Sequence, residues 1–332
     1  EKLLKSTYTP ELNPIIEYLD KVRKRKPVGT IKKLASCIKT NNDAMFEKYL
    51  TKWLASSVAN VVNKIGCQNH TCIVFTGGQF AGKTTFFKWL CPPELKEYMY
   101  TGSIDLESKD SLWKLAEYWF INIEEQLKNL NKKDANKVKE LFSLPDIKGR
   151  KPYGRLETQG FRIANFMAST NDEDFLVDAT GNRRFLCFKV EKINDTEYNK
   201  IKIDDVWAEA YHYYNENPNT YYVTPEDIAE LEENNKLFMH NTQEFEYCNI
   251  TFKKPAENAS YYLLPAAIIR DYIKSITFCQ TLKDRNIGIA LKQLNFEQVT
   301  HRFTGSSFGI KVWKVALIND KIDGRTIIEP YH

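Results

Sequence analysis

Residues 74–90 read VFTGGQFAGKTTFFKWL, and the fold of the chain follows from this stretch. An apolar run ends at Gly77, and the pattern G-x-x-x-x-G-K-[ST] closes at Gly82, Lys83 and Thr84, where a helical pattern begins. The glycines let backbone N–H groups converge on phosphate oxygens, and the N-terminus of the following helix adds a favourable dipole. The stretch therefore predicts a phosphate-binding loop whose contacts come from Gly77, Gly78, Ala81, Gly82, Lys83, Thr84 and Thr85.

Two side chains of this loop carry its chemistry. In loops of this type the lysine, here Lys83, places a point charge on the outer phosphates of a nucleotide. The hydroxyl of the next residue, Thr84, is a ligand for Mg²⁺. ATP and Mg²⁺ are therefore the expected ligands. The alternative is a tight turn that binds no phosphate.

A later apolar run ends in two acids. EYWFINIEEQL, residues 117–127, predicts a buried strand followed by Glu124 and Glu125. Two acids at a strand end suit an ATPase, in which the first helps to hold the metal and the second activates the attacking water. Glu124 stands where an aspartate is usual and is one methylene longer. The alternative is a pair of solvated acids at the end of a strand.

Two further strands end or begin with polar groups of the kind that phosphoryl transfer uses. IANFMASTN ends at Asn171, whose amide is predicted to orient the attacking water or to sense the γ-phosphate. TGNRRFLCF places Arg183 and Arg184 before the next strand, and a planar guanidinium suits the charge of a phosphoryl group in transfer. If a neighbouring subunit supplied this arginine, hydrolysis would depend on assembly. Both arginines are candidates and Arg183 is preferred, while the other can pair with a carboxylate.

The chain of 332 residues, 42% of them hydrophobic, is long enough for two or three domains. Residues 1–66 have helical periodicity, with one apolar face over 46–61 that Asn42 or Asp43 can cap. Residues 67–195 alternate apolar runs with helical patterns, which predicts an α/β domain with a largely parallel sheet. Residues 196–245 form an acid-rich helical extension, and 246–332 show a helix, a helix and a hairpin, the outline of a winged-helix-like α+β module.

Composition narrows the class of protein. No apolar stretch approaches the roughly 20 residues of a membrane span, and the first residues are polar, so we expect a cytoplasmic protein without a membrane anchor. Seven scattered cysteines without a C-x-x-C pair favour reduced structural thiols. A net charge of +4 leaves nucleic-acid binding to local basic clusters. The chain lacks an initiator methionine, so we expect a longer protein with a segment upstream.

These motifs, in this order, resemble the virulence-associated protein E family, one of the superfamily 3 helicase-like ATPases of phages and mobile elements. The resemblance runs over about two thirds of the chain, from LNPIIEYLDKV through FTGGQFAGKTT and LAEYWFINIEE to VWAEAYHYY. PYGR followed by STN and TGNRRF is its most diagnostic set, and the part after residue 250 matches less clearly. The resemblance implies a P-loop NTPase core of AAA+-like type within a hexameric ring that hydrolyses ATP at subunit interfaces and moves along DNA.

The resemblance also assigns roles to residues. It implies Lys83 and Thr84 as the Walker A pair, Glu124 and Glu125 as Walker B, and Asn171 as the sensor. One of the two arginines would be the finger that acts in trans. In such helicases a hairpin between the acids and the sensor reaches the central channel, and here it would span 146–162. Its DNA-binding residues would be Lys148, Arg150, Lys151 and Arg155.

The residues of this segment agree with that reading. Residues 146–162 hold five basic side chains, including Arg162, against two acids, and Gly149, Pro152 and Gly154 suit an exposed loop. Such a loop would contact phosphates rather than bases. Arg155 and Arg162 have the alternative of facing the nucleotide, and the whole segment has the alternative of being a solvated basic loop.

The sequence therefore predicts an ATP-driven DNA helicase that replicates a phage or mobile element, with a primase domain or subunit upstream as a fitting partner. Two other functions stay open: an ATP-gated DNA-binding or assembly protein that does not unwind, and a P-loop kinase of small molecules. The kinase would need neither the basic hairpin nor an arginine in trans. Polarity of movement, preference for DNA or RNA, ring size and the role of the C-terminal module are not predicted.

Overall fold

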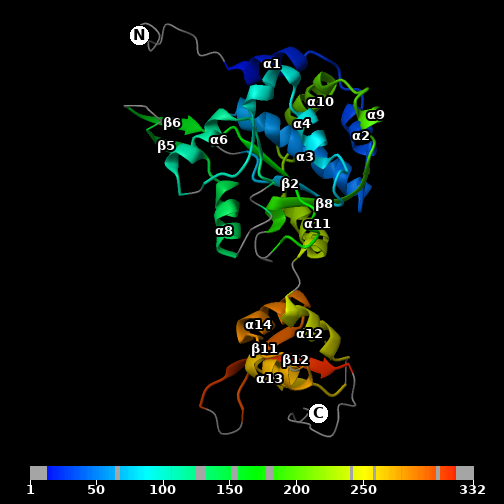
Figure 1. Ribbon diagram of the computed structural model, residues 1–332, viewed down its shortest axis with the longest axis vertical. Helices are drawn as coiled ribbons and strands as arrows, with labels where there is room; N and C mark the ends of the chain where they lie inside the picture. The colour runs from blue at the N-terminus through cyan, green and yellow to red at the C-terminus, as the bar shows by residue number, and fades with distance from the viewer. Residues whose placement is uncertain are drawn as a thin grey trace. The chain divides into compact units, whose positions relative to one another are not determined.

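In the computed structural model the chain forms two compact units, Glu1–Met239 and His240–His332 (Figure 1). The predicted segments 1–66 and 67–195 fall within the first unit, 246–332 falls within the second, and 196–245 crosses the boundary. The structure describes residues 13–63, 68–105, 107–124, 127, 132–150, 156–176, 182–239, 242–256, 259–277, 279–303 and 307–318.

A six-stranded sheet lies at the centre of the first unit. Its strands are β1 (Ile38–Thr40), β2 (Cys72–Thr76), β3 (Met99–Thr101), β4 (Phe120–Asn122), β7 (Asn165–Ser169) and β8 (Phe185–Ile193). They follow the order β1-β8-β2-β7-β4-β3, in which only β1 runs antiparallel to its neighbour. The predicted α/β arrangement with a largely parallel sheet is confirmed. β1 and β3 were not predicted, because each has three residues of mixed polarity and neither lies in an apolar run such as the WFINI that contains β4.

The order of the strands creates a switch point at β2. From β2 the chain passes to the far edge at β3, returns through β4 and β7, and then crosses to β8 on the other side of β2. In open parallel sheets, ligands bind outside the carboxyl ends of the strands at such a point. The loop that follows β2 therefore lies where a ligand is expected from topology alone.

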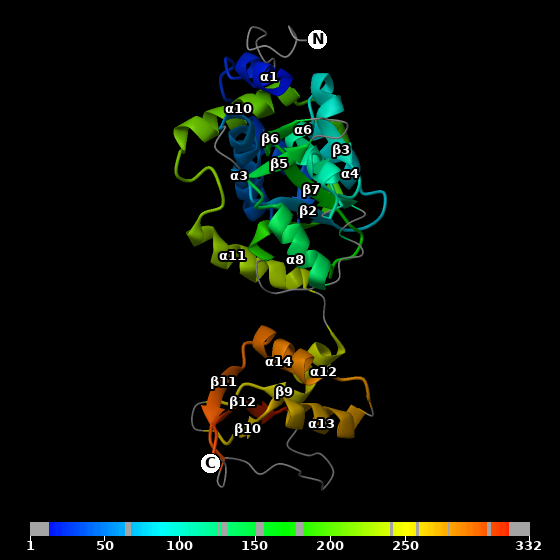
Figure 2. The ribbon, with the colours of Figure 1, turned by 90° about the vertical axis from the view of Figure 1, so that its left-hand side faces the viewer.

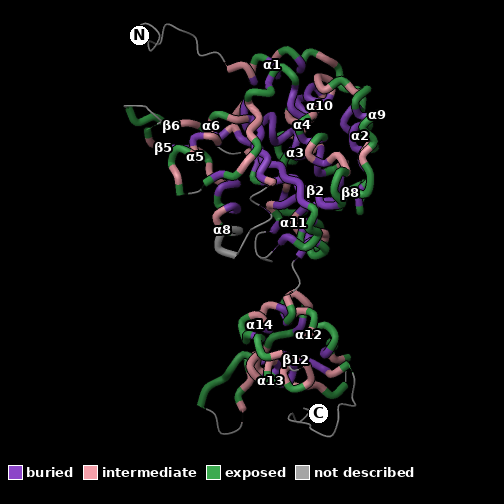
Figure 3. Tube along the Cα trace, viewed as in Figure 1, coloured by how far each residue is buried: buried purple, intermediate pink, exposed green. Residues whose placement is uncertain are grey.

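Helices cover both faces of the sheet, so alternate residues of a strand belong to different cores. In β2, Ile73 and Phe75 belong to the first core, whereas Cys72 and Val74 belong to the second. Figure 3 shows β2 buried along its length. The first core is covered by α1 (Pro14–Val22), α2 (Thr30–Ser36), α3 (Asp43–Val62), α4 (Lys83–Leu90) and α10 (Ile203–Glu216), and the second by α6 (Lys114–Glu117), α8 (Lys132–Leu141) and the 3₁₀ helix η3 (Lys236–Phe238).

The first unit has further helical elements, and the longest of them adds Leu231 to the first core. They are η1 (Pro93–Tyr98), α5 (Lys109–Leu112), η2 (Asn182–Arg184), α9 (Asp195–Tyr198) and α11 (Pro225–Asn235). None of the helices in the described residues is long and apolar enough to cross a membrane.

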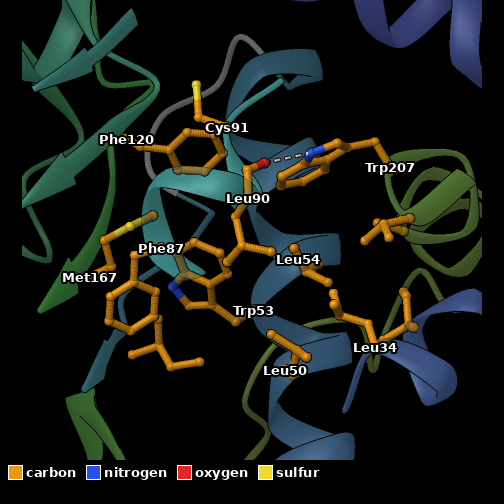
Figure 4. Packing of buried hydrophobic residues seen from close by; sticks show 14 of the residues in the cluster. Leu34, Leu50, Trp53, Leu54, Phe87, Leu90, Cys91, Phe120, Met167 and Trp207 are labelled. Atoms are coloured by element: carbon orange, nitrogen blue, oxygen red, sulfur yellow. Dashed lines mark hydrogen bonds between the residues drawn. The ribbon is translucent and has the colours of Figure 1, made fainter. Parts of the chain in front are cut away.

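Aromatic packing fixes the strand and the helix on either side of the predicted phosphate loop. The ring of Phe75, in β2, lies 4.6 Å from that of Phe87 and 5.6 Å from that of Phe86, both in α4. The far end of α4 is held as well, because Leu90 O accepts a hydrogen bond of 3.0 Å from the indole of Trp207 (Figure 4). The loop between β2 and α4 is therefore anchored at both ends in the first core.

The predicted apolar face of α3 is confirmed, because its apolar residues between 46 and 61 are buried. Asn42 does cap the helix, through a bond of 3.1 Å from Met45 N to its side chain. However, 14 of the 20 residues of α3 are buried, among them Ser57 and Asn60 on its polar side. Asn60 is buried against the start of β7, where its Nδ2 donates to Asn165 Oδ1 at 2.9 Å. Elsewhere along α3, α10 packs against the helix, as Figures 1 and 2 show.

The predicted hairpin between the acids and the sensor is confirmed. β5 (Asp146–Arg150) pairs antiparallel with β6 (Glu157–Phe161) as a separate two-stranded sheet. The hairpin rests on Trp113, whose indole donates to Arg150 O at 3.0 Å. A Cβ on Gly160 would lie 2.6 Å from the Trp113 ring, so the glycine is required for this close contact.

In the second unit, the predicted order of a helix, a helix and a hairpin is observed, with one correction. LLPAAIIRDYIKSI begins as a strand, because Pro265 ends the strand and starts the helix. Three strands each pair antiparallel with β12. Leu291 and Val315 belong to the hydrophobic core of this unit. The elements are α12 (Gln243–Thr251), β9 (Phe252–Lys253), β10 (Tyr262–Leu264), α13 (Ala266–Thr277), α14 (Asp284–Gln293), β11 (Glu297–His301) and β12 (Ile310–Leu317).

A buried ion pair joins α3 to α11. Asp227 accepts a bond of 2.5 Å from Lys52 and one of 2.9 Å from Lys48, and its carboxylate also accepts from Thr224 N at 2.9 Å. Burial raises the pKa of Asp227, but these donors outweigh burial and bring the pKa down to about 2. The charged carboxylate is therefore part of the folded structure.

We predict that Asp227→Asn lowers the free energy of unfolding by roughly 3 kcal/mol at pH 7, because Lys52 stays buried without its counter-charge. Since the folded-state pKa lies below the unfolded one, the wild type should lose about 2 kcal/mol more than the variant as pH falls from 5 to 2. Urea unfolding followed by tryptophan fluorescence measures both. As a control, Glu233→Gln removes an exposed ion pair with Lys236 and should change stability little. Equal losses in the two variants would contradict the assignment.

Candidate functional site

Residues that follow the carboxyl ends of β2, β4 and β7 meet at one edge of the sheet. Because these strands are parallel neighbours, the loop after β2, Glu124 after β4 and Asn171 after β7 come together. They enclose a cavity of about 360 Å³. Its lining consists of Gln79, Phe80, Ala81, Gly82, Lys83, Thr84, Thr85, Glu124, Ser169, Thr170 and Asn171.

The ammonium group of Lys83 lies inside the loop. It donates to Gly77 O at 2.8 Å and to Gly78 O at 2.6 Å, and it reaches Asn171 Oδ1 at 3.2 Å. Burial lowers the pKa of Lys83, and the carboxylate of Glu124 opposes that shift. The predicted lysine and the predicted sensor amide are therefore in direct contact.

Glu124 is the centre of a second group of contacts. Its Oε1 accepts from the Thr84 hydroxyl at 2.6 Å and from the Ser169 hydroxyl at 2.5 Å, and these two hydroxyls lie 3.0 Å apart. Asn122 Nδ2 donates to the same oxygen at 3.0 Å. Burial raises the pKa of Glu124, but the hydrogen bonds from the three donors lower it by more. The net shift of the pKa is therefore downward. The carboxylate is thus held in its charged form.

The backbone of the loop takes conformations that ordinary residues avoid. Gly77 has φ of 136°, and a Cβ on it would lie 2.6 Å from Val190 O. Gly82, which begins α4, has φ of 79°. Phe80 also has a positive φ, 61°, although it is not a glycine, and its side chain is fully exposed. Backbone strain of this kind clusters at ligand sites.

The residues present fit the predicted ligands. Gly82 has no heavy atom within 4 Å of a Cβ position, so a phosphate can approach the N-terminus of α4. The hydroxyl of Thr84 and the carboxylate of Glu124 are hard oxygen donors of the kind that Mg²⁺ prefers. Asn122 Oδ1 is buried and has no hydrogen-bond partner among the described residues, so the site holds unused acceptor capacity beside Glu124. Glu125, predicted to activate water, lies outside the described residues.

The two predicted arginines lie at the opposite edge of the sheet. They immediately precede β8, which runs parallel to β2 with Phe185 opposite Cys72. Five residues of strand rise about 16 Å, so Arg183 stands that far from the edge where the loop begins. Arg183 is exposed, whereas Arg184 is half-buried and its Nε donates to the hydroxyl of Ser143 at 3.2 Å. The two arginines therefore have different surroundings, although they are adjacent in the chain.

The predicted basic hairpin shows a similar division. Lys148 and Arg150 are exposed on β5, while Lys151 and Arg155 lie outside the described residues. Both readings of Arg162, on the exposed hairpin or facing the nucleotide, are wrong. Its side chain is fully buried and donates to the backbone carbonyls of Ala164 at 3.1 Å and Asn69 at 2.8 Å.

Comparison with known proteins agrees with the motifs. The family described as Virulence-associated protein E-like domain matches residues 19–240, which is more than half of the chain. The chain belongs to this family. The resemblance seen in the motifs is therefore confirmed, and no curated protein sequence matches the chain significantly.

A solved structure has a similar fold. The apo structure of NrS-1 C terminal region (305-718) aligns over 93% of this virulence-associated protein E-like chain and 79% of its own, with a TM-score of 0.52 at 12% identity. Two A form apo structures of the same region align with TM-scores of 0.47 and 0.48 at 12% and 13% identity. At this identity the likeness concerns the fold alone.

Two side-chain contacts in the candidate site of this chain were not predicted from the sequence. Asn122 is the one polar residue in the apolar strand WFINI, and its side chain donates to Glu124. A polar residue within an apolar strand was the sequence signal that could have indicated this contact. Ser169 was noted only as one of three polar residues at a strand end, but its hydroxyl binds both Glu124 and Thr84. A single sequence cannot show which of Ser169, Thr170 and Asn171 points into the site.

We predict that Gly77→Ala lowers the free energy of unfolding by about 2 kcal/mol, because its Cβ would meet Val190 O and its φ is strained for alanine. Gly78→Ala is the matched control, since it has ordinary φ and no heavy atom within 4 Å of a Cβ. Thermal unfolding of both variants measures the difference. Equal melting temperatures would show that the loop is not held against β8 as described.

Proposed function

We propose that the chain is an ATP hydrolase with a P-loop core that acts on DNA. The observation that carries the proposal is the cluster at the carboxyl edge of the sheet. Lys83 contacts the loop carbonyls and Asn171, while Thr84 contacts Glu124. A lysine, a hydroxyl, an acid and an amide, converging at the N-terminus of a helix, match the needs of nucleotide triphosphate hydrolysis.

Each residue would have a separate task. Backbone N–H groups of the loop and the N-terminus of α4 would hold the phosphates, and Lys83 would turn its ammonium from the loop carbonyls to the outer phosphates. Thr84 and Glu124 would hold Mg²⁺, which when bound neutralises charge on the phosphates. Asn171, already 3.2 Å from Lys83, would orient the attacking water, and Glu125 would accept its proton.

The position of Arg183 supports catalysis between subunits. It precedes β8 at the amino edge, so it cannot reach the loop of its own chain across the length of β2. Its exposure leaves it available to another copy. We therefore propose a homo-oligomer, a hexameric ring by analogy with superfamily 3 helicases, in which Arg183 completes the site of a neighbour.

The exposed cations of the β5–β6 hairpin support binding to single-stranded DNA. Lys148 and Arg150 are exposed on β5, and exposed cations of this kind track phosphates. Lys151 and Arg155 follow them in the sequence. Together with the family membership, this favours a helicase or translocase in replication of a phage or mobile element, with an upstream primase as a possible partner. The second unit is proposed to be a winged-helix-like module.

An ATP-gated DNA-binding or assembly protein would use the same residues without unwinding. A small-molecule kinase is a weaker candidate, because it would not need the hairpin. Strand displacement on forked DNA, measured beside ATP hydrolysis with and without single strands, separates the three. ATP hydrolysis and DNA binding without strand displacement would favour the ATP-gated DNA-binding or assembly protein. ATP hydrolysis that does not respond to DNA would favour the small-molecule kinase.

We predict that Lys83→Ala and Arg183→Ala subunits are each inactive but regain ATP turnover when mixed. With random assembly, roughly a quarter of the interfaces join an intact loop to an intact arginine. A mixture of Lys83→Ala with Glu124→Gln is the control, because both defects lie on the same side of the interface. Turnover that stays absent at every ratio of the first pair would contradict a shared site.

We also predict that Lys148→Ala combined with Arg150→Ala weakens binding to single-stranded DNA and reduces the slope of log affinity against log salt by about 1.4. The reason is that two phosphate contacts are lost. Lys24→Ala with Lys26→Ala removes the same charge from an exposed segment after α1 and should leave the slope unchanged. Fluorescence anisotropy with a labelled oligonucleotide at several salt concentrations measures both. An unchanged slope in the hairpin variant would exclude the hairpin as a DNA contact.

A further inference from the structure

The root of the β5–β6 hairpin is tied to the body of the first unit by a buried arginine. The backbone N–H of Arg162, just after β6, donates to Pro145 O at 3.2 Å and so closes the hairpin. Its guanidinium donates to Phe142 O, at the end of α8, and to Asn69 O at 2.8 Å, before β2. The segment 142–145 is therefore fixed to both strands of the hairpin and to the sheet.

Ser143, within this root, also contacts the turn that carries the two arginines. Its hydroxyl accepts the 3.2 Å bond from Arg184 Nε and lies 3.4 Å from Lys139 O, to which it donates. Arg184 is half-buried, and burial together with neighbouring Arg183 lowers its pKa. A half-buried guanidinium needs hydrogen-bond acceptors, and the hydroxyl of Ser143 is the acceptor for the Nε of Arg184.

The arginine turn is rigid on its other side. Asn235, at the end of α11 and fully buried, donates from Nδ2 to Asn182 O and to Phe185 O, both at 2.9 Å. One amide therefore brackets Arg183 and Arg184 in η2. Because the turn cannot bend freely, displacement of Arg184 would be transmitted to Arg183.

We infer that Arg184 is a positioning residue that links Arg183 to the hairpin through Ser143. This inference rests on the proposed function, in which Arg183 serves the nucleotide of a neighbour and the hairpin contacts DNA. Within one subunit, a shift of the hairpin root would move Ser143, then Arg184, and then the turn that presents Arg183. The arginine at the neighbouring site would thus respond to the nucleic acid held by the same subunit.

The alternative reading is purely local: Arg184 fills a half-buried site and Ser143 satisfies it. The two readings differ in what happens to the effect of DNA on ATP turnover. A local role would alter stability alone. A linking role would alter the stimulation of kcat by single strands while leaving the KM for ATP unchanged.

The test uses the full chain with Ser143→Ala, Ser143→Thr and Ser36→Ala. Ser143→Thr retains a hydroxyl, and Ser36→Ala removes a serine whose hydroxyl bonds to a helical carbonyl, Lys33 O, at 2.8 Å far from the turn. ATP turnover is measured with and without a single-stranded oligonucleotide, together with the melting temperature and the affinity for that oligonucleotide. We expect Ser143→Ala to keep basal turnover, KM and DNA affinity but to lose stimulation, whereas the other two variants keep it.

Three outcomes would overturn the inference. Stimulation of Ser143→Ala equal to that of the wild type would do so while leaving the proposed function intact. Loss of basal turnover in a folded Ser143→Ala chain would show that Arg184 belongs to the hydrolytic site itself. A wild type that hydrolyses ATP but ignores single strands would remove the proposed action on DNA and the inference with it.

Discussion

The parallel pairing of β2 with β7 and β8 is the constraint from which the remaining structure follows. In the parallel part of the sheet it places the loops that follow the strands at one edge and the segments that precede the strands at the other. Lys83, Glu124 and Asn171 meet because their strands are neighbours that end together. Arg183 and the root of the β5–β6 hairpin are kept away from them for the same reason. The sheet thus separates the edge that carries the cavity from the edge that carries Arg183 and the root of the hairpin.

Packing then holds the ligand edge in a shape that the loop would not adopt alone. Phe75, Phe86 and Phe87 lock β2 and α4 together, and Val190 O lies so close to Gly77 that no side chain fits between them. Phe80 and Gly82, which lie between these anchors, have positive φ values. Free energy from the hydrophobic core therefore offsets the strain of a preformed cradle, which reduces the cost of ordering it when a ligand binds.

Sequence patterns predicted much of this arrangement, and their failures have physical causes. The phosphate loop and the four central strands follow from local patterns, so the sequence sufficed for Lys83 and Thr84. The hairpin was implied by the family resemblance, whereas the local pattern of the segment indicated only an exposed loop. Arg162 and the polar side of α3 are buried by segments that are distant in the sequence. Local composition therefore predicted exposed positions for residues that are buried. The contacts of Asn122 and Ser169 with Glu124 depend on strand register, and a single sequence does not contain that information.

The most direct test is the structure of the full chain with a non-hydrolysable ATP analogue and Mg²⁺. We expect the phosphates to lie on residues 77–84, with the metal between Thr84 and Glu124, and with Arg183 of a second copy facing the outer phosphate. A nucleotide bound elsewhere would contradict the account. A monomer that binds the nucleotide in its loop and hydrolyses ATP at full rate would also contradict the account. In that case hydrolysis would not need Arg183 from a second subunit.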